Sequence, residues 1–274
     1  MDVSFIQIVV LALIQGAAEL LPVSSSAHVI IAERFMGLDP SSPAMTFLLV
    51  MLHTGTMFAV LYYFWPRWKK LAFDFYKNIV WATAMTGILG LGLKKLIETV
   101  SQGEIEGLFK SLPLMAFSLF CGGILILIAG LKTNTGPESA LTTRSSILIG
   151  LVQGLCLPFR GFSRSGATIS TGMLLKIPRA LAEDFSFALA VVLTPPVVAL
   201  QLYRLLKVSE VFPTSEILPG LLGMVCSFAS GLLALRWLSN WLEHGRWKLF
   251  GVYCLVASGV VTTLYFLDLF PKLS

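Results

Sequence analysis

The chain has 274 residues, of which 56% are hydrophobic and only 13% are charged, and its mean hydropathy is +0.82. A soluble globular protein carries about 25% charged residues, so this chain has too few charges to solvate the surface of a water-soluble domain. The net charge of +5 is spread along the sequence, which excludes a nucleic-acid partner and suits a bilayer with anionic headgroups. The composition therefore indicates a polytopic helical membrane protein. It excludes a soluble enzyme, a disordered chain and a DNA-binding domain.

Six long windows of the sequence are almost entirely apolar, and about 20 apolar residues suffice to span a bilayer core. They are Thr46–Phe64, Ile79–Leu93, Leu112–Leu131, Ala182–Leu202, Leu218–Leu235 and Leu249–Leu267. Short polar loops separate them, without any flexible linker or low-complexity tract. We therefore expect an all-α protein with six transmembrane helices that form a single membrane domain over residues 1–274. The sequence does not determine the oligomeric state, and a homodimer is one option.

Two further apolar stretches, Val9–Ile31 and Ile147–Leu175, are interrupted by proline, glycine, serine and charged residues. Such residues are tolerated at membrane depth only where the backbone is buried in protein or lines a polar cavity. Each stretch is therefore predicted to form a re-entrant helical hairpin, with its polar turn pointing into the protein.

The two interrupted stretches also resemble each other in sequence. Ile14-Gln15-Gly16, Leu21-Pro22 and a serine cluster in the first match Val152-Gln153-Gly154, Leu157-Pro158 and a serine cluster in the second. Each stretch precedes three apolar windows, so the second hairpin enters from the opposite face. This pattern predicts an inverted-topology repeat with halves 1–135 and 136–274. The interface between such halves, near the membrane midplane, is where functional sites tend to form. Chance similarity between two Gly/Pro/Ser-rich hairpins is the alternative.

Loop charges predict the orientation of the chain in the membrane. Counted over alternate loops, Lys and Arg are more numerous on the side that holds Arg67, Lys69, Lys70 and Lys77. The side richer in these residues is generally cytoplasmic. The first hairpin is then expected to open outward and the second inward.

The first interrupted stretch contains a cluster of residues that are costly to place in a membrane and so indicate a functional site. Its members are Gln15, Glu19, Ser24, Ser25, Ser26 and His28. Gln15 and Glu19 are four residues apart and share one helix face. His28 follows Ser25 by three residues, and a nearby imidazole is the usual base for a nucleophilic hydroxyl. The alternative for Ser24 or Ser25 is a purely structural role as a helix N-cap.

The second interrupted stretch carries a basic cluster. Its members are Arg160, Ser163, Arg164, Ser165, Gly166 and Thr168. A guanidinium group within a membrane needs an anionic partner, and its geometry matches phosphate oxygens. The first amides of the helix that begins at Ser165 would add to an anion-binding site. The alternatives are an Arg164–Glu19 ion pair without ligand, and an Arg160 side chain that extends to the membrane interface.

The remaining candidates are weaker. His53 lies within the first long window, where a hydrogen-bonded structural histidine is more common than a catalytic one. The four cysteines lie in apolar stretches without CxxC spacing, so we expect small buried side chains rather than disulfides or metal ligands.

Three of these motifs together resemble the undecaprenyl pyrophosphate phosphatase family (BacA/UppP). They are Gln15-x-x-x-Glu19, Leu21-Pro22-Val23-Ser24-Ser25-Ser26-Ala27-His28 and Gly161-Phe162-Ser163-Arg164-Ser165-Gly166-Ala167-Thr168. The resemblance covers the whole chain in length and motif order. It implies an enzyme of the bacterial inner membrane that hydrolyses undecaprenyl pyrophosphate to undecaprenyl phosphate and phosphate, recycling the lipid carrier for peptidoglycan synthesis. The family's activity is associated with bacitracin resistance, and its site is taken to face the periplasm.

The resemblance also assigns roles to residues. It implies that Glu19, Ser25, His28 and Arg164 are catalytic, and that a divalent cation, Mg²⁺ or Ca²⁺, binds at Gln15 and Glu19. The neighbouring polar residues are expected to bind the substrate: Ser24, Ser26, Arg160, Ser163, Ser165, Gly166 and Thr168. The sequence departs from the commoner family pattern in three places. Gln15 stands in place of Glu and Ala27 in place of Gly, and two extra residues between Pro158 and Gly161 bring the additional Arg160.

These roles lead to one mechanistic hypothesis and one rival function. The hypothesis is in-line attack by Ser25 on the terminal phosphorus, with His28 as base and Arg164 neutralising charge. Direct attack by His28 is the alternative. Glu19 would bind the cation, orient His28 or handle a proton, and the sequence does not decide among these roles. The rival function is a transporter or lipid flippase, since inverted repeats with broken helices and a midplane charge are typical of transporters too.

Overall fold

The computed structural model describes residues 3–39, 42–101, 111–132, 137–208 and 216–270. All regular elements in these ranges are helices, as the composition predicts. They are α1 (Phe5–Leu20), α2 (Ser25–Phe35), α3 (Pro43–Trp68), α4 (Phe73–Ser101), α6 (Leu112–Leu131), α7 (Thr143–Cys156), α8 (Arg164–Leu174), α9 (Arg179–Val208), α10 (Ile217–Glu243) and α11 (Trp247–Phe266).

Six of the described helices are long and apolar enough to cross a membrane: α3, α4, α6, α9, α10 and α11. They coincide with the six apolar windows, and α6 has the predicted bounds. Most of the others extend several residues past their windows, as α3 does at both ends. Their outward-facing side chains are largely apolar, for example Phe73, Leu218 and Phe266, each more than three-quarters exposed. This surface suits lipid rather than water.

Small residues let the helix backbones approach closely. A Cβ atom at Gly55 on α3 would lie only 2.2 Å from the Met224 carbonyl oxygen on α10. A Cβ at Gly150 on α7 would lie 2.3 Å from the Ala82 carbonyl oxygen on α4. Because lipid provides no hydrophobic drive for helix association, such close packing is the usual way in which membrane helices adhere.

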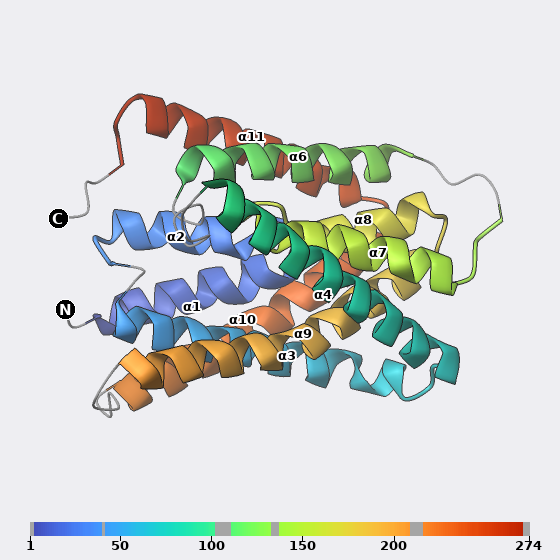
Figure 1. Cartoon of the computed structure of the whole chain (residues 1–274), viewed down its shortest axis with the longest axis horizontal. Helices are drawn as coiled ribbons and strands as arrows, with labels where there is room; N and C mark the ends of the chain where they lie inside the picture. Colours follow the sequence, from blue (N-terminus) through green and yellow to red (C-terminus); the bar gives the residue numbers. More distant parts are fainter. Residues whose placement is uncertain (1–2, 40–41, 102–110, 133–136, 209–215, 271–274) are drawn as a thin grey trace.

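The four shorter helices form two successive pairs, α1 with α2 and α7 with α8, surrounded by the long helices (Figure 1). Helix α1 packs against α10, and α7 packs in the corresponding way against α4. Helix α8 contacts α6 and α9 as well as α7. The turns of both pairs, residues 21–24 and 157–163, lie midway along the molecule (Figure 1), and except for the exposed Leu157 their residues are buried or half-buried.

The four cysteines are free thiols in this structure, and Cys121 and Cys226 are only partly buried, in contrast to the sequence prediction. Cys156 and Cys254 are buried, and each donates a weak hydrogen bond to a backbone carbonyl oxygen.

Candidate active site

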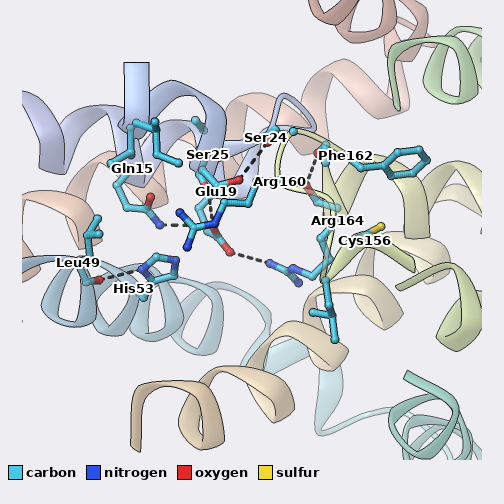
Figure 2. Close-up of a pocket in the computed structure, with 18 of the residues that line it drawn as sticks. Gln15, Glu19, Ser24, Ser25, Leu49, His53, Cys156, Arg160, Phe162 and Arg164 are labelled. Atoms are coloured by element: carbon cyan, nitrogen blue, oxygen red, sulfur yellow. Dashed lines mark hydrogen bonds and ion pairs between the residues drawn. The ribbon is translucent and has the colours of Figure 1, made fainter. Parts of the chain in front are cut away.

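The turns of both helix pairs border one cavity of about 370 Å³. Its walls come from α1, α2, α3, α9 and the segment 156–165 (Figure 2). The polar and charged side chains that line it are Gln15, Glu19, Ser24, Ser25, Ser26, Glu33, Thr46, His53, Arg160, Ser163, Arg164, Ser165 and Gln201. Two motifs that are more than 130 residues apart in sequence thus meet at one place.

The first turn presents Ser25 at the beginning of α2. Helix α1 ends at Leu20, shortly before Pro22, which cannot continue it. Ser24 then adopts φ = 70° and ψ = 92°, a left-handed conformation that costs a non-glycine residue energy. Its side chain makes no capping hydrogen bond to α2. The backbone is therefore held in a strained turn directly before Ser25, as is common at functional sites.

Ser25, Glu19 and Arg164 form a connected chain of hydrogen bonds. The Ser25 hydroxyl donates to Glu19 Oε2 at 2.5 Å, and Arg164 Nη2 donates to Glu19 Oε1 at 2.9 Å. The amide of Gln15 donates to Glu19 Oε2 at 3.3 Å. Glu19 thus holds the hydroxyl and the guanidinium on its two oxygens, and the ion pair considered from the sequence is present inside the cavity.

The second turn positions Arg164. Gly161 has φ = 107°, and a Cβ there would lie 2.3 Å from the Met115 carbonyl oxygen, so only glycine fits. The Ser163 hydroxyl accepts from the Gly166 amide and caps α8. Arg164 Nη1 is buried, and no hydrogen-bond partner for it is found among the described residues. This donor is available to an anionic ligand.

The electrostatics of the first turn favour an ionised Glu19. Burial alone would raise the pKa of Glu19, but the Arg164 guanidinium, the nearby His53 ring and the Ser25 hydrogen bond outweigh it and hold this pKa below its usual value. An ionised carboxylate is the form that can accept a proton from Ser25.

His28 does not lie where the sequence hypothesis requires it. Its Nδ1 is 2.8 Å from the Ser24 carbonyl oxygen, which can only accept, so Nδ1 carries the hydrogen. Its Nε2 is 2.6 Å from the Tyr253 hydroxyl on α11, and the two rings are stacked. Burial lowers the pKa of His28, although the bond to Ser24 opposes this, so the neutral ring accepts from Tyr253. Both ring nitrogens are thus engaged away from Ser25, which has Glu19 as its acceptor.

The structure brings most of the expected substrate-binding residues to the cavity. Ser24, Ser26, Arg160, Ser163 and Ser165 line it, and Arg160 projects toward the space beside Glu19 and Ser25 (Figure 2).

The other two expected substrate contacts lie deeper in the protein, outside the cavity lining. The Gly166 amide donates to the Ser163 hydroxyl, and the Thr168 hydroxyl lies 2.6 Å from that of Ser186 on α9. Thr168 lies one helical turn beyond Arg164, about 6 Å further along α8 from the turn, and Gly166 faces Ile126 of α6.

The chain is similar in sequence to known proteins. The family described as Bacitracin resistance protein BacA matches residues 8–260. The chain belongs to the BacA family. The matched range includes every residue of the Ser25–Glu19–Arg164 chain.

Proteins named undecaprenyl-diphosphatase match over nearly the full chain. Undecaprenyl-diphosphatase 2 of Acinetobacter baylyi is 56% identical over an alignment 278 residues long. The alignment covers 94% of this chain and 97% of that protein. Undecaprenyl-diphosphatases of Bdellovibrio bacteriovorus and Aquifex aeolicus are 30% and 31% identical, and cover 96% and 95% of this chain.

His53 and Glu33 are among the cavity residues for which the sequence predicts no site role. His53 lines the cavity while its Nδ1 hydrogen-bonds the Leu49 carbonyl oxygen at 2.8 Å, so it is both a bonded helix residue and a neighbour of Glu19. Glu33 is fully buried on α2 and also lines the cavity. Helical spacing could have found it, since Ser25, Val29 and Glu33 recur every four residues and share one face.

The described residues contain no group of three or more His, Cys, Asp or Glu side chains that could hold a metal ion. At the expected position, Glu19 contributes one carboxylate and Gln15 one amide. Mg²⁺ is commonly bound by one or two carboxylates together with substrate phosphates. The donor set therefore fits a cation that shares ligands with a phosphate substrate, rather than a complete protein cage.

Proposed function

We propose that this protein is an undecaprenyl-diphosphate phosphatase. It hydrolyses undecaprenyl diphosphate to undecaprenyl phosphate and inorganic phosphate, and so recycles the lipid carrier for peptidoglycan synthesis. The observation that carries the proposal is the chain of hydrogen bonds from the Ser25 hydroxyl through Glu19 to Arg164, inside the cavity of a BacA-family membrane protein. It combines a nucleophile (Ser25), a base (Glu19) and a guanidinium group that can bind phosphate (Arg164).

The first half-reaction transfers the terminal phosphoryl group to Ser25. As the Ser25 oxygen attacks the distal phosphorus in line, its proton passes to Glu19 along the 2.5 Å hydrogen bond. Neutralising Glu19 weakens its hold on Arg164, whose guanidinium then binds the phosphoryl oxygens where charge is stabilised in the transition state. The bond to the bridging oxygen breaks, and undecaprenyl phosphate leaves with the proton from Glu19.

The second half-reaction frees the enzyme. Glu19 is ionised again once undecaprenyl phosphate has left with its proton. Water then attacks the phosphorus of the phosphoserine at position 25 and gives one proton to Glu19. The phosphorus–oxygen bond to Ser25 breaks, the serine oxygen takes the proton from Glu19, and phosphate is released. Each step uses Glu19 alternately as base and acid.

This mechanism assigns the role of base to Glu19 instead of His28. Glu19 accepts the hydrogen bond from Ser25, whereas the His28 ring nitrogens are engaged with Ser24 and Tyr253. His28 holds the strained turn before Ser25 through its bond to the Ser24 carbonyl oxygen.

A divalent cation, Mg²⁺ or Ca²⁺, is part of the proposal. Glu19 and Gln15 are the residues that would hold it, together with oxygens of the diphosphate. When bound, it supplies additional neutralisation of phosphate charge.

The membrane topology of the proposal has two re-entrant hairpins in an inverted repeat. Helices α1, α2, α7 and α8 have 16, 11, 14 and 11 residues. At 1.5 Å per residue each is shorter than the roughly 30 Å bilayer core. Helix α1 of the first half packs against α10, and its counterpart α7 in the second half packs against α4, the counterpart of α10. This matched packing supports the repeat. Figure 1 supports the two pairs entering from opposite ends of the molecule.

The proposed setting is the bacterial inner membrane, with the cavity open to the periplasm. The excess of Lys and Arg in the last turn of α3 and directly after it, at Arg67, Lys69 and Lys70, supports a cytoplasmic position for that end. The prenyl chain of the substrate lies along the apolar helices, and its diphosphate reaches the two turns. A homodimer remains a prediction from the sequence.

The experiment that tests this function measures phosphate release from undecaprenyl diphosphate by the purified protein in detergent. We expect turnover by the wild-type protein and none above background by Ser25→Ala. Expression of the wild-type protein, but not of Ser25→Ala, should also raise the bacitracin resistance of a sensitive host. Lipid translocation by a protein that releases no phosphate would refute the proposal in favour of a transporter.

A further inference from the structure

The mechanism above does not use Glu33, the most unusual buried group in the cavity. Its side chain is 0% exposed, and neither carboxylate oxygen has a hydrogen-bond partner among the described residues. Burying a carboxylate without partners is costly unless the group is neutralised or meets a ligand. Because Glu33 lines the cavity, a ligand in that cavity can satisfy it.

Glu33 lies on the same face of α2 as the nucleophile. Ser25, Val29 and Glu33 all line the cavity, and eight residues of helix separate the outer two by about 12 Å. Helical side chains tilt toward the helix N-terminus, so the Glu33 carboxyl group leans toward Ser25. A diphosphate with one end at Ser25 extends along this face toward Glu33.

The charges around the cavity determine which form of Glu33 can accompany an anionic substrate. Two carboxylates, Glu19 and Glu33, stand against two guanidinium groups, Arg160 and Arg164. With both carboxylates ionised, the lining offers no net positive charge to a diphosphate. A neutral Glu33 leaves one positive charge in excess and supplies an O–H donor in place of a repelling carboxylate.

The surroundings of Glu33 favour its neutral form. Burial raises the pKa of Glu33 to about 7, with Arg160 lowering it and Asp39 raising it. The other elements packed around α2 bring Glu19 from α1 and His53 from α3 to the same cavity, and the contact from α6 is the apolar Met115.

We propose that Glu33 is a specificity-determining contact for the diphosphate, to which its neutral carboxyl group donates a hydrogen bond while Arg160 binds neighbouring phosphate oxygens. This inference rests on the proposed function, because it requires a diphosphate in the cavity. The contact exists at low pH and is lost as the pH rises through 7, because the ionised carboxylate has no proton to donate and repels the phosphate.

The test compares KM for undecaprenyl diphosphate between pH 6 and 8.5 in wild-type protein and Glu33→Gln, at one fixed Mg²⁺ concentration. Glutamine keeps the size and an N–H donor but cannot ionise. With a pKa of about 7, the neutral fraction of Glu33 falls about ten-fold from pH 6 to pH 8. The ratio of wild-type to variant KM should therefore rise about ten-fold over this interval. Ionisation of the substrate itself affects both proteins equally and cancels in the ratio.

The matched control is Glu138→Gln, the same substitution at an exposed position before α7, which should follow wild type at every pH. A ratio that stays constant from pH 6 to 8.5, or a pH-dependent difference confined to kcat, would overturn the proposal. A wild-type protein that releases no phosphate at any pH refutes the proposed function, whereas a constant ratio in an active enzyme refutes only the role of Glu33.

A second measurement needs no folded variant. Calorimetric binding of a prenyl methylenediphosphonate to wild-type protein, in two buffers of different ionisation enthalpy, counts the protons taken up. After subtraction of the analogue's own separately titrated ionisation, we expect close to one proton at pH 8 and little uptake at pH 6. Absence of uptake at pH 8 would contradict the proposed contact.

Discussion

Replacing Glu19 by glutamine tests the core of the catalytic arrangement. The substitution preserves the shape of the side chain and an oxygen that can still accept a hydrogen bond. It removes the negative charge that receives the Ser25 proton and balances Arg164. Activity and stability are therefore expected to fall together, but for different reasons and by different amounts.

The structure sets the size of both effects. Loss of a general base typically costs about 10²–10⁴-fold in rate, which corresponds to about 3–5 kcal/mol of transition-state stabilisation. Removing one partner of a buried ion pair costs about 3–5 kcal/mol of folding stability. The Arg164 and Glu19 side chains keep 19% and 18% exposure, so we expect the lower end, about 3 kcal/mol.

The assay measures kcat for phosphate release together with the thermal unfolding midpoint of the same detergent-solubilised preparation, at a temperature well below that midpoint. Glu98→Gln is the control, because it removes a surface pair with Lys94, which typically contributes about 0–1 kcal/mol. A Glu19→Gln protein that remains folded and keeps wild-type kcat would refute the assignment of Glu19 as base.

Three further outcomes are expected. A phosphoenzyme trapped by acid quench should carry acid-stable phosphoserine at Ser25; an acid-labile adduct at His28 would show that the histidine attacks directly. Gly161→Ala should lower the thermal midpoint strongly, because φ = 107° and a carbonyl oxygen 2.3 Å from the added Cβ both oppose it. Gly87→Ala, in open space, should leave the midpoint nearly unchanged, and equal shifts would contradict this account. Chelation of divalent cations should raise KM for the diphosphate, with recovery on adding Mg²⁺; activity that is indifferent to chelator would remove the cation from the mechanism.

The membrane-spanning part of the fold could be predicted from the sequence almost completely. The window Thr46–Phe64 lies inside α3, which runs from Pro43 to Trp68. The prediction is too short because hydropathy ends where polar or interfacial residues begin, whereas backbone hydrogen bonding continues the helix beyond that point. The interrupted stretches were likewise correctly expected to break into short helices, since Pro22 and Pro158 cannot continue a helix at these turns.

The sequence predicted which residues form the candidate site better than it predicted how they contact one another. Spacing of three residues made His28 a reasonable base for Ser25, because positions i and i+3 are neighbours on a helix. In the structure the strained turn at Ser24 places Ser25 against Glu19, and α11 supplies Tyr253 to hold the other side of His28. These contacts depend on how α2 is rotated among its neighbours, which its own sequence does not specify.

The sequence by itself determined that this is a helical membrane protein of the BacA family and which two motifs carry its polar residues. Hydropathy and motif identity are local properties that can be read without knowing how the helices pack. Only the tertiary structure decided that Glu19 is the acceptor for Ser25 and the partner of Arg164. It also decided that Glu33 is buried in the same cavity with no hydrogen-bond partner in the part of the chain that the structure describes. Burial and pairing of charges are properties of the surroundings, and here those surroundings are built by α1, α2 and a turn more than 130 residues away.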